Sequence, residues 1–560
     1  MIAHLTSLEN RIPKSIEGAD QKLPYLLKQL ERLNSIGVAL SAERDNKRLL
    51  EMILLGAKEI TNADGGTIYS VTDDKQLKFE IMSNETLNIA LGGTTGKDIP
   101  FSPLPLYLDD GRPNLTTVAA YAVLNDRTVN IENAYEAKNF DFTGSRKFDE
   151  RTGYHSQSFL TIPMKNHEAV IIGVLQLINA IDIDTREIIP FSAENQSLVE
   201  SLASQAAVAM TNQNLIEGLK GLFEAFIELM AEAIDQKSPY TGGHCRRVPE
   251  LTLMLGQAAI DAKTGPLKDF TLNEKEFYEL KIAGWLHDCG KVTTPEYVMD
   301  KATKLSSIFD RMLLIDQRFE LLKTQAECHM LKMQLAAMQN GMQADVAKLK
   351  SEYEAFVLQC DEDRDFLQKS NFGGEFMTPE DQQRVRDIAA IPLLDADGRV
   401  GPFLSENEVL NLNITRGTLT SEERVIINNH INVTISMLES LPYPNSLKRV
   451  PEYAGGHHER MDGKGYPKGL TREQMSVPAR VMGIADIFEA LTSKDRPYKK
   501  AKTLTESLYI LGKMKLDNHI DPDLFDLFIR EKIYLKYAHR FLEPEQIDDV
   551  DETKIPGYQP

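Results

Sequence analysis

The sequence predicts a multidomain protein in which an α+β domain precedes an all-helical domain that is interrupted by a long helical insert. Three observations lead to this prediction. Residues 30–213 mix apolar runs at helical spacing with short runs rich in β-branched residues, which is typical of an α+β domain. Strand patterns nearly disappear after residue 238. Residues 306–416 are charged and helical in pattern, unlike the blocks on either side.

The bulk composition is that of an ordinary folded protein. A chain of 560 residues exceeds one hydrophobic core, and its 42% hydrophobic and 26% charged residues lie close to globular averages. The four cysteines form no CxxC pair, which indicates free thiols. A net charge of -20 argues against DNA or RNA as a partner. We find no membrane span or signal peptide and therefore expect a cytoplasmic protein without a membrane partner.

The first domain contains recognisable helices and strands. Helical spacing at 26–42 and 47–63 predicts two helices, and β-rich runs predict strands at 66–71, 159–164 and 169–180.

A long helix is expected to join the two domains. The helical pattern of 194–210 continues through 211–238, and no proline occurs there before Pro239. Such a helix can carry a displacement from one domain to the next or pair with its copy, and the alternative is a plain spacer. We expect a homodimer through this helix. The expected organisation is an N-terminal helical or linker segment (1–29), the α+β domain (30–213), the connecting helix (214–238), the helical domain (225–305 and 417–540), its insert (306–416) and a C-terminal tail (541–560).

The insert itself should contain two antiparallel helices, because its helical pattern breaks at Asn340-Gly341. A looser stretch follows, with turns expected at Gly373-Gly374 and within 395–403.

The helical domain carries histidines and carboxylates in short blocks, at His244, His287-Asp288, His430, His457-His458 and Asp486. A pair of divalent metal ions needs several imidazoles and at least one carboxylate able to reach both ions. The adjacent His287 and Asp288 could serve one metal ion only near a helix end, and Gly290 is consistent with a helix ending there.

His430 is expected on a helix that begins with the capping box Thr420 to Glu423. A single histidine on an apolar helix face is usually a hydrogen-bonded core residue, but the companion blocks favour a metal ligand. We expect an inward-facing stripe of Ile426, His430, Val433 and Met437.

The blocks and their order resemble the HD-GYP family of cyclic di-GMP phosphodiesterases. The resemblance covers residues 225–515 apart from the insert, and it rests on HDCGK (287–291) and HHERMDGKGYP (457–467). It implies an HD-type phosphohydrolase fold with two divalent metal ions, iron or manganese, bridged by the catalytic Asp288. The metal ligands implied by the family are His244, His287, Asp288, His430, His457, His458 and Asp486.

The resemblance also implies substrate-binding residues. Lys291 would neutralise a phosphate oxygen or assist the leaving group, as a second catalytic residue. A third metal ion in some family members uses an acidic residue, and the aligned position here is Tyr240, so we expect two ions. The remaining substrate-binding residues would be Gly465, Tyr466, Pro467, Arg496 and Lys499.

The implied reaction is hydrolysis of cyclic di-GMP to linear pGpG and possibly on to GMP. One alternative is an effector that binds cyclic di-GMP and recruits a partner with little turnover. Another is an HD phosphohydrolase acting on mononucleotides, which would lack the GYP block.

The α+β domain resembles GAF domains, particularly in residues 148–181. GAF domains that bind cyclic nucleotides usually carry an Asn-Lys, Phe and Asp-Glu signature. The matching positions here are Asn179-Ala180, Phe191 and Asn195-Gln196, so three of the five differ. The resemblance implies a sensory domain with an unidentified small ligand or none, or a domain that only dimerises.

Overall fold

A computed structural model describes residues 19–237, 243–339, 343–374, 376–395, 397–494 and 501–559. The described chain forms two compact units, and the boundary between them falls between Leu222 and Phe223, within helix α6 (Ala193–Lys237).

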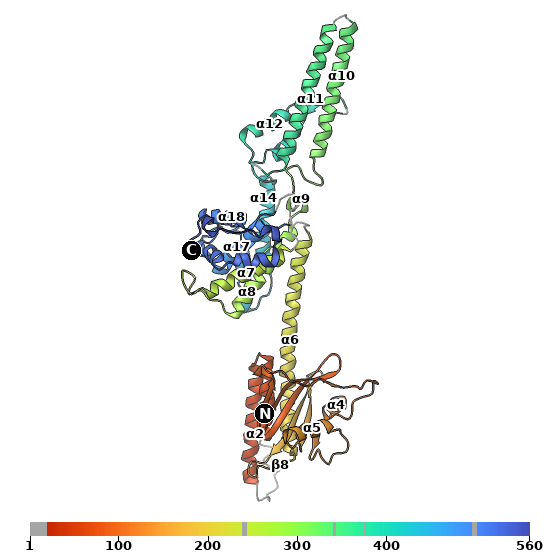
Figure 1. Cartoon of the computed structure of the whole chain (residues 1–560), viewed down its shortest axis with the longest axis vertical. Helices are drawn as coiled ribbons and strands as arrows, with labels where there is room; N and C mark the ends of the chain where they lie inside the picture. Colours follow the sequence, from red (N-terminus) through yellow and green to blue (C-terminus); the bar gives the residue numbers. More distant parts are fainter. Residues whose placement is uncertain are drawn as a thin grey trace, which may run out of the picture. The chain divides into compact units, whose positions relative to one another are not determined.

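An antiparallel sheet of eight strands, counted within the described residues, forms the centre of the first unit (Figure 1). Its main path runs β3-β2-β1-β7-β6-β5, while β4 pairs with β2 and β8 with β7. In the central pair, Gly66 lies opposite Leu177 and Ile68 opposite Leu175. The strands are β1 (Ala63–Val71), β2 (Gln76–Asn84), β3 (Ile89–Gly92), β4 (Leu104–Pro105), β5 (Val129–Ile131), β6 (Phe159–Lys165), β7 (Ile171–Ile181) and β8 (Ile188–Ile189).

One face of this sheet packs on α2 (Ala19–Ala42), α3 (Asn46–Thr61) and the first part of α6. Ile68 of β1 points into this core, while its neighbour Tyr69 belongs to the cluster on the opposite face, as strand geometry requires. A Cβ atom at Gly66 would lie 2.7 Å from Cδ1 of Leu54, so glycine allows α3 to approach the strand closely.

The opposite face of the sheet is covered by α4 (Val118–Leu124). Phe142, just before α5 (Thr143–Thr152), also belongs to a hydrophobic cluster on this face. The predicted α+β class is thereby confirmed. The strands expected from the three β-rich runs are β1, β6 and β7, and the two expected helices are α2 and α3.

The second unit is mainly helical and contains two neighbouring cores that meet at α7 (His244–Asp261). The last residues of the chain, expected as a tail, pack on one of these cores through Ile547, Ile555 and Tyr558. None of the helices in the described part is both long and apolar enough to cross a membrane. The other helices of these cores are α8 (Glu274–Leu286), α15 (His430–Glu439), α16 (Val450–Gly455), α17 (Val477–Thr492), α18 (Leu504–Leu516), α19 (Pro522–Arg530) and α20 (Ile533–Phe541).

The insert has a hydrophobic core of its own. Its two long helices are antiparallel, because Lys323 pairs with Asp361 while Gln368 reaches back to Asp316. The helix break expected at Asn340-Gly341 lies outside the described residues. The elements of this region are α9 (Glu296–Met299), α10 (Met312–Gln339), α11 (Gln343–Asn371), α12 (Pro379–Ala389), β9 (Pro392–Leu394), β10 (Val400–Pro402), α13 (Glu406–Leu412) and α14 (Ser421–Asn428).

Where only turns were expected in the insert, the structure contains a short hairpin of β9 and β10. The turn itself is present, closed by Gly398 in the left-handed conformation and by the Asp395 carboxylate, which accepts the N–H of Arg399. Three-residue strands carry too few residues to show an alternating pattern, which is why the pairing was not predicted.

The stripe predicted around His430 is wrong in part. The capping box is present, but the expected single helix breaks at Asn429 into α14 and α15. Ile426 is 38% exposed although His430 is buried, so the two side chains do not share a buried face. The residues of α15 that are buried with His430 are Ile431, Thr434 and Leu438.

Candidate metal centre

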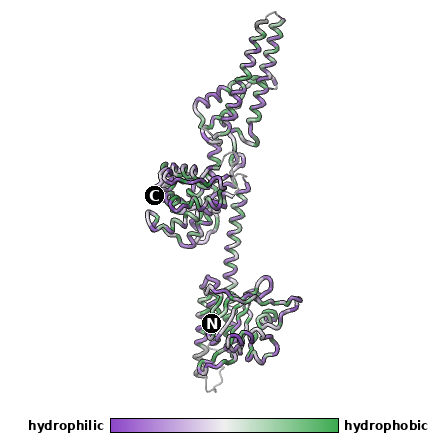
Figure 2. The backbone as a smooth tube through the Cα atoms, viewed as in Figure 1, coloured by the Kyte–Doolittle hydropathy of each residue, from purple (hydrophilic) through white to green (hydrophobic). Residues whose placement is uncertain are grey.

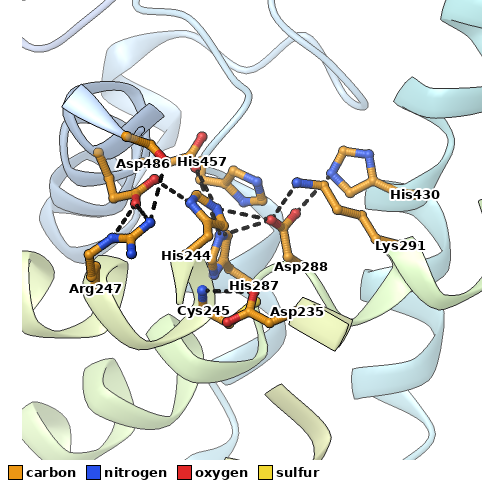
Figure 3. A network of polar contacts seen from close by, with 12 residues as sticks. Asp235, His244, Cys245, Arg247, His287, Asp288, Lys291, His430, His457 and Asp486 are labelled. Atoms are coloured by element: carbon orange, nitrogen blue, oxygen red, sulfur yellow. Dashed lines mark hydrogen bonds and ion pairs between the residues drawn. The ribbon is translucent and has the colours of Figure 1, made fainter. Parts of the chain in front are cut away.

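Seven side chains from five helical segments meet in the second unit (Figure 3). Most lie at helix ends. Consecutive side chains within a helix point about 100° apart, but residues at a helix end leave this geometry and can face the same point. They are the seven residues expected as metal ligands. Their positions are His244 at the start of α7, His287 and Asp288 after α8, His430 at the start of α15, His457 and His458 after α16, and Asp486 within α17.

The first group of ligand atoms comes from His244, His287 and Asp288, all buried and within 4.8 Å of one another. Nε2 of His244 lies 3.3 Å from Nε2 of His287 and 3.2 Å from Oδ2 of Asp288. Oδ1 of Asp486 lies 3.3 Å from the same His244 nitrogen. This group offers two imidazoles and two carboxylates to one point in space.

The second group consists of His430, His457 and His458. Nε2 of His430 lies 3.2 Å from Nε2 of His458 and 3.3 Å from Oδ1 of Asp288. Asp288 therefore turns one carboxylate oxygen toward each group, which is the arrangement a bridging ligand needs.

Three of the histidines are oriented by the same local contact. Nδ1 of His287, His430 and His457 each donates to the backbone carbonyl three residues earlier, at 2.8, 2.6 and 2.6 Å respectively. A carbonyl can only accept, so each Nδ1 carries a proton and Nε2 is the nitrogen that faces the site. Their position at helix ends leaves those carbonyls available as acceptors.

The donor atoms of the site are better satisfied by metal cations than by hydrogen bonds with one another. Among the described residues, neither Nε2 of His457 nor Oδ1 of Asp288 has a hydrogen-bond partner, although both atoms are buried. The Nε2 atoms of His430 and His458 lie 3.2 Å apart, and one cation could accept both as ligands. Cations among these atoms would satisfy all of them, because divalent transition metals bind imidazole nitrogen and carboxylate oxygen together.

The local electrostatics match this donor set. Burial and the neighbouring imidazoles hold the pKa of His457 far below its usual value, and burial lowers the pKa of His458 to about 4, so both are neutral at pH 7. Burial pushes the pKa of Asp288 up, but Lys291 and His287 outweigh it and the pKa falls well below normal. Asp288 is therefore a carboxylate at pH 7.

Two family models match the chain, an HD domain at residues 404–524 and a GAF domain at residues 45–210. The chain contains a GAF domain followed by an HD domain. The HD match includes His430, His457, His458 and Asp486, whereas His287 and Asp288 lie before the insert and outside the matched range.

Two relatives and one solved structure are similar to parts of the chain. A 3'3'-cGAMP-specific phosphodiesterase of Vibrio cholerae is 34% identical over 131 residues, which are 23% of this chain and 29% of the relative. A cyclic di-GMP phosphodiesterase of Pseudomonas aeruginosa is 36% identical over 131 residues, 23% of this chain and 30% of the relative. The matches thus span about 30% of the relatives' own length. The GAF domain of an Acinetobacter phosphoenolpyruvate-protein phosphotransferase aligns with 34% of this chain and 98% of its own, with 16% identity and a TM-score of 0.25.

The structure describes four of the six residues expected to bind substrate in the HD domain, namely Lys291, Gly465, Tyr466 and Pro467. Nζ of Lys291 lies 2.6 Å from Oδ2 of Asp288, and the Tyr466 ring stacks on the His458 ring with centroids 4.8 Å apart. Gly465 lies so close to the backbone of Glu459 that a Cβ atom would be 2.5 Å from its Cα. Pro467 follows a cis peptide bond in the same loop.

Glu459 holds this loop in place. Its buried carboxylate accepts the backbone N–H groups of Lys468 and Leu470 at 2.7 and 2.9 Å. Three other positions considered from the sequence, Arg496, Lys499 and Tyr240, lie outside the described residues.

Sequence reasoning missed Glu489 of the HD domain. Its carboxylate lies 2.5 Å from Nδ1 of His244 and accepts a 2.7 Å hydrogen bond from Nε of Arg247. Burial lowers the pKa of His244, but the charge of Glu489 and the contacts with Asp288 outweigh burial and raise it. The signal was available: Glu489 lies three residues after Asp486, and Arg247 three after His244, so each shares a helix face with a ligand.

Two residues in the last turn of α6 contact the backbone next to the metal centre. Asp235 is buried and accepts the backbone N–H groups of Gly243 and Cys245, which flank His244, at 3.0 and 3.3 Å. Nζ of Lys237 donates to the carbonyls of Lys291 at 3.2 Å and Thr294 at 2.7 Å, and also to that of Val292. Two residues of one helical turn thus hold the backbone beside a metal ligand and beside Lys291.

Proposed function

We propose that this protein is a metal-dependent phosphodiesterase that hydrolyses cyclic di-GMP to linear pGpG, with GMP as the product of any second cut. The observation that carries the proposal is the Asp288 carboxylate, whose two oxygens face two separate groups of imidazole ligands. Relatives named as cyclic dinucleotide phosphodiesterases support the choice of substrate class.

The proposed cofactors are two divalent ions, iron or manganese, because both accept mixed imidazole and carboxylate ligands. His244, His287 and Asp486 would hold one ion and His430, His457 and His458 the other, with Asp288 shared. Bound there, the ions would supply Lewis acidity and an activated water for attack on phosphorus.

The chain's own residues have distinct proposed roles. The ammonium of Lys291, kept charged by Asp288 although it is mostly buried, would neutralise a phosphate oxygen or assist the leaving group. Tyr466 would line the base pocket beside His458, in a loop whose shape depends on Gly465 and Pro467. Arg496 and Lys499 stay predictions as phosphate-binding residues.

The test is a product assay on the full chain loaded with reduced iron or with manganese. Cyclic di-GMP and 3'3'-cGAMP are offered separately, because one relative is named for the second substrate. We expect pGpG from cyclic di-GMP, and we expect Asp288→Ala to lose metal binding and turnover together. Asp387→Ala, an exposed carboxylate in the insert, serves as the matched control.

Two results would contradict this proposal. Tight binding of cyclic di-GMP without any product would favour the effector alternative, in which the occupied pocket recruits a partner. Faster cleavage of 3'3'-cGAMP than of cyclic di-GMP would overturn the substrate assignment but not the reaction type.

We further propose a homodimer through α6. Apolar residues recur along this helix with alternating spacings of four and three, and Figure 2 shows the tube of α6 changing repeatedly between green and purple. Each of these side chains is between 59% and 68% exposed. A seam with this spacing is that of a coiled coil. The seam residues are Leu215, Leu219, Leu222, Phe226 and Leu229.

Light scattering after size exclusion tests the dimer. We expect twice the chain mass for the parent protein and a monomer for Leu219→Asp, with Lys220→Asp on the same turn as the control. A monomeric parent protein would contradict the proposal. A cytoplasmic location stays a prediction from the sequence.

A further inference from the structure

A cavity of about 440 Å³ lies in the GAF domain, apart from the metal centre. Residues of β1, β2, β6 and β7 line it, together with the starts of α4 and α5. Cavities of this size are typical of sites for small organic ligands.

Aromatic rings make up much of the cavity wall. Seven of its 24 lining residues are Phe or Tyr. Tyr69, Phe79 and Phe101 form one cluster, with successive ring centroids 4.7 and 5.6 Å apart. Phe142 and Phe159 form a second, with centroids 5.2 Å apart. Such walls favour a flat apolar ligand, because aromatic pairs gain from offset and edge contacts in addition to burial.

The side chains of the wall offer no positive charge to an anion. The residues that line it, all within the described chain, include no lysine, arginine or histidine. Burying an uncompensated anion costs several kcal/mol or more. A helix start can compensate an anion. Two helices start at the wall: α4 has only seven residues, and at the start of α5 the Asp141 carboxylate already accepts the Thr143 N–H at 2.8 Å. A ligand phosphate at the start of α5 would lie beside the Asp141 carboxylate and be repelled by it.

The carboxylates near the cavity do not call for a cation either. Asp141 is exposed and bonded to the helix start. Asp64, buried behind the wall, accepts hydrogen bonds from Thr86 N–H at 3.1 Å, from Thr86 Oγ1 at 2.7 Å and from the Tyr154 hydroxyl at 2.5 Å. Both charges are therefore compensated within the protein.

Apart from Asp141, the polar side chains of the wall are neutral. Gln176 accepts from Tyr69 and donates to Thr161, so it is a fixed, uncharged part of the wall. The one asparagine that matches the nucleotide-binding signature, Asn179, uses its side chain on the backbone of His155, Gln157 and Ser158. That asparagine therefore holds residues 155–158, just before β6, in place and is not available to a ligand.

We propose that this cavity binds an uncharged aromatic small molecule and excludes nucleotides and other anions. Three probes with one ring system separate charge from shape: tryptophol is neutral, indole-3-acetate is an anion and tryptamine is a cation. Cyclic AMP and cyclic GMP are the nucleotide probes. Binding to the full chain is followed by saturation-transfer NMR and by calorimetry at millimolar probe concentration.

We expect tryptophol to bind at least on the order of 100-fold more tightly than indole-3-acetate, from the cost of burying an unpaired anion. Tryptamine should also bind more weakly than tryptophol. Equal or tighter binding of indole-3-acetate or of either cyclic nucleotide would overturn the proposal, and so would the absence of tryptophol binding.

A pair of variants ties binding to the cavity. Gly144 lines the cavity, and a Cβ atom there meets no atom within 4 Å, so Gly144→Trp should fill the space without displacing the fold. Lys147→Trp adds the same ring to the exposed face of α5 outside the wall. Tryptophol binding should be lost in the first and kept in the second. Binding that persists in Gly144→Trp would place the probe elsewhere and sink the proposal.

Discussion

Oε2 of Glu489 lies 2.5 Å from Nδ1 of His244, while Oε1 of the same carboxylate accepts a 2.7 Å hydrogen bond from Arg247. The pair is buried, and it connects α17 to the first turn of α7. A carboxylate in this position orients the imidazole and raises its basicity as a ligand. The contact joins two helices that each carry a proposed metal ligand.

Glu489→Gln should weaken metal binding about 10- to 100-fold, because the amide keeps the shape but loses the charge that supports His244. Metal titration of the purified protein measures the change. Glu439→Gln, an exposed carboxylate at the end of α15, is the control. Unchanged metal affinity in Glu489→Gln would mean that the carboxylate serves only the fold.

Gly290→Ala should destabilise the HD domain by about 2–3 kcal/mol, because a Cβ atom there would lie 2.0 Å from the carbonyl oxygen of His430. The backbone of α15 would have to move, and a metal ligand with it. Urea unfolding monitored by circular dichroism gives the free energy of unfolding. Gly374→Ala, where a Cβ atom meets nothing within 4 Å, should leave it nearly unchanged.

Lys237→Met should lower kcat more than it raises KM, because three backbone carbonyls beside Lys291 lose their shared donor. Lys237→Arg should restore most of the rate, since a guanidinium can donate to the same carbonyls. Steady-state kinetics on the metal-loaded chain separate the two constants. A rate equally reduced in both variants would point to general damage rather than to a positioning role.

Stability should depend on pH through Lys304. Burial lowers the pKa of this lysine to about 8 from 10.5, although its ammonium donates to the Leu412 carbonyl at 2.9 Å. Between these two pKa values the unfolded chain binds more protons than the folded chain. The free energy of unfolding should therefore rise as the pH increases through this window.

Denaturant unfolding at several pH values checks this expectation. The rise in the free energy of unfolding with pH should be smaller in Lys304→Met than in the parent protein. It should be unchanged in Lys348→Met, because the Lys348 side chain is 75% exposed. A pH profile identical in parent and Lys304→Met would show that another group causes the dependence.

Sequence patterns predicted the elements with long, regular periods. The strands β1, β6 and β7 and the helices α2 and α3 follow from apolar spacing over many residues. The hairpin of β9 and β10 did not, because three-residue strands show no period. The inward stripe around His430 failed at Ile426, which is exposed, because helical spacing does not show which turns of a helix are covered by other elements.

The sequence by itself determined which residue types are available for metal chemistry, since the spacing of His287-Asp288 and His457-His458 can be read from the chain. Only the tertiary structure decided how they are used. Four of the five histidines are oriented by a second contact, with Glu489 for His244 and with a backbone carbonyl three residues earlier for His287, His430 and His457. The carbonyl contacts are local, but the hydrogen bond from Glu489 and the meeting of the Nε2 atoms depend on distance and direction between atoms far apart in sequence, which are fixed only when the helices pack.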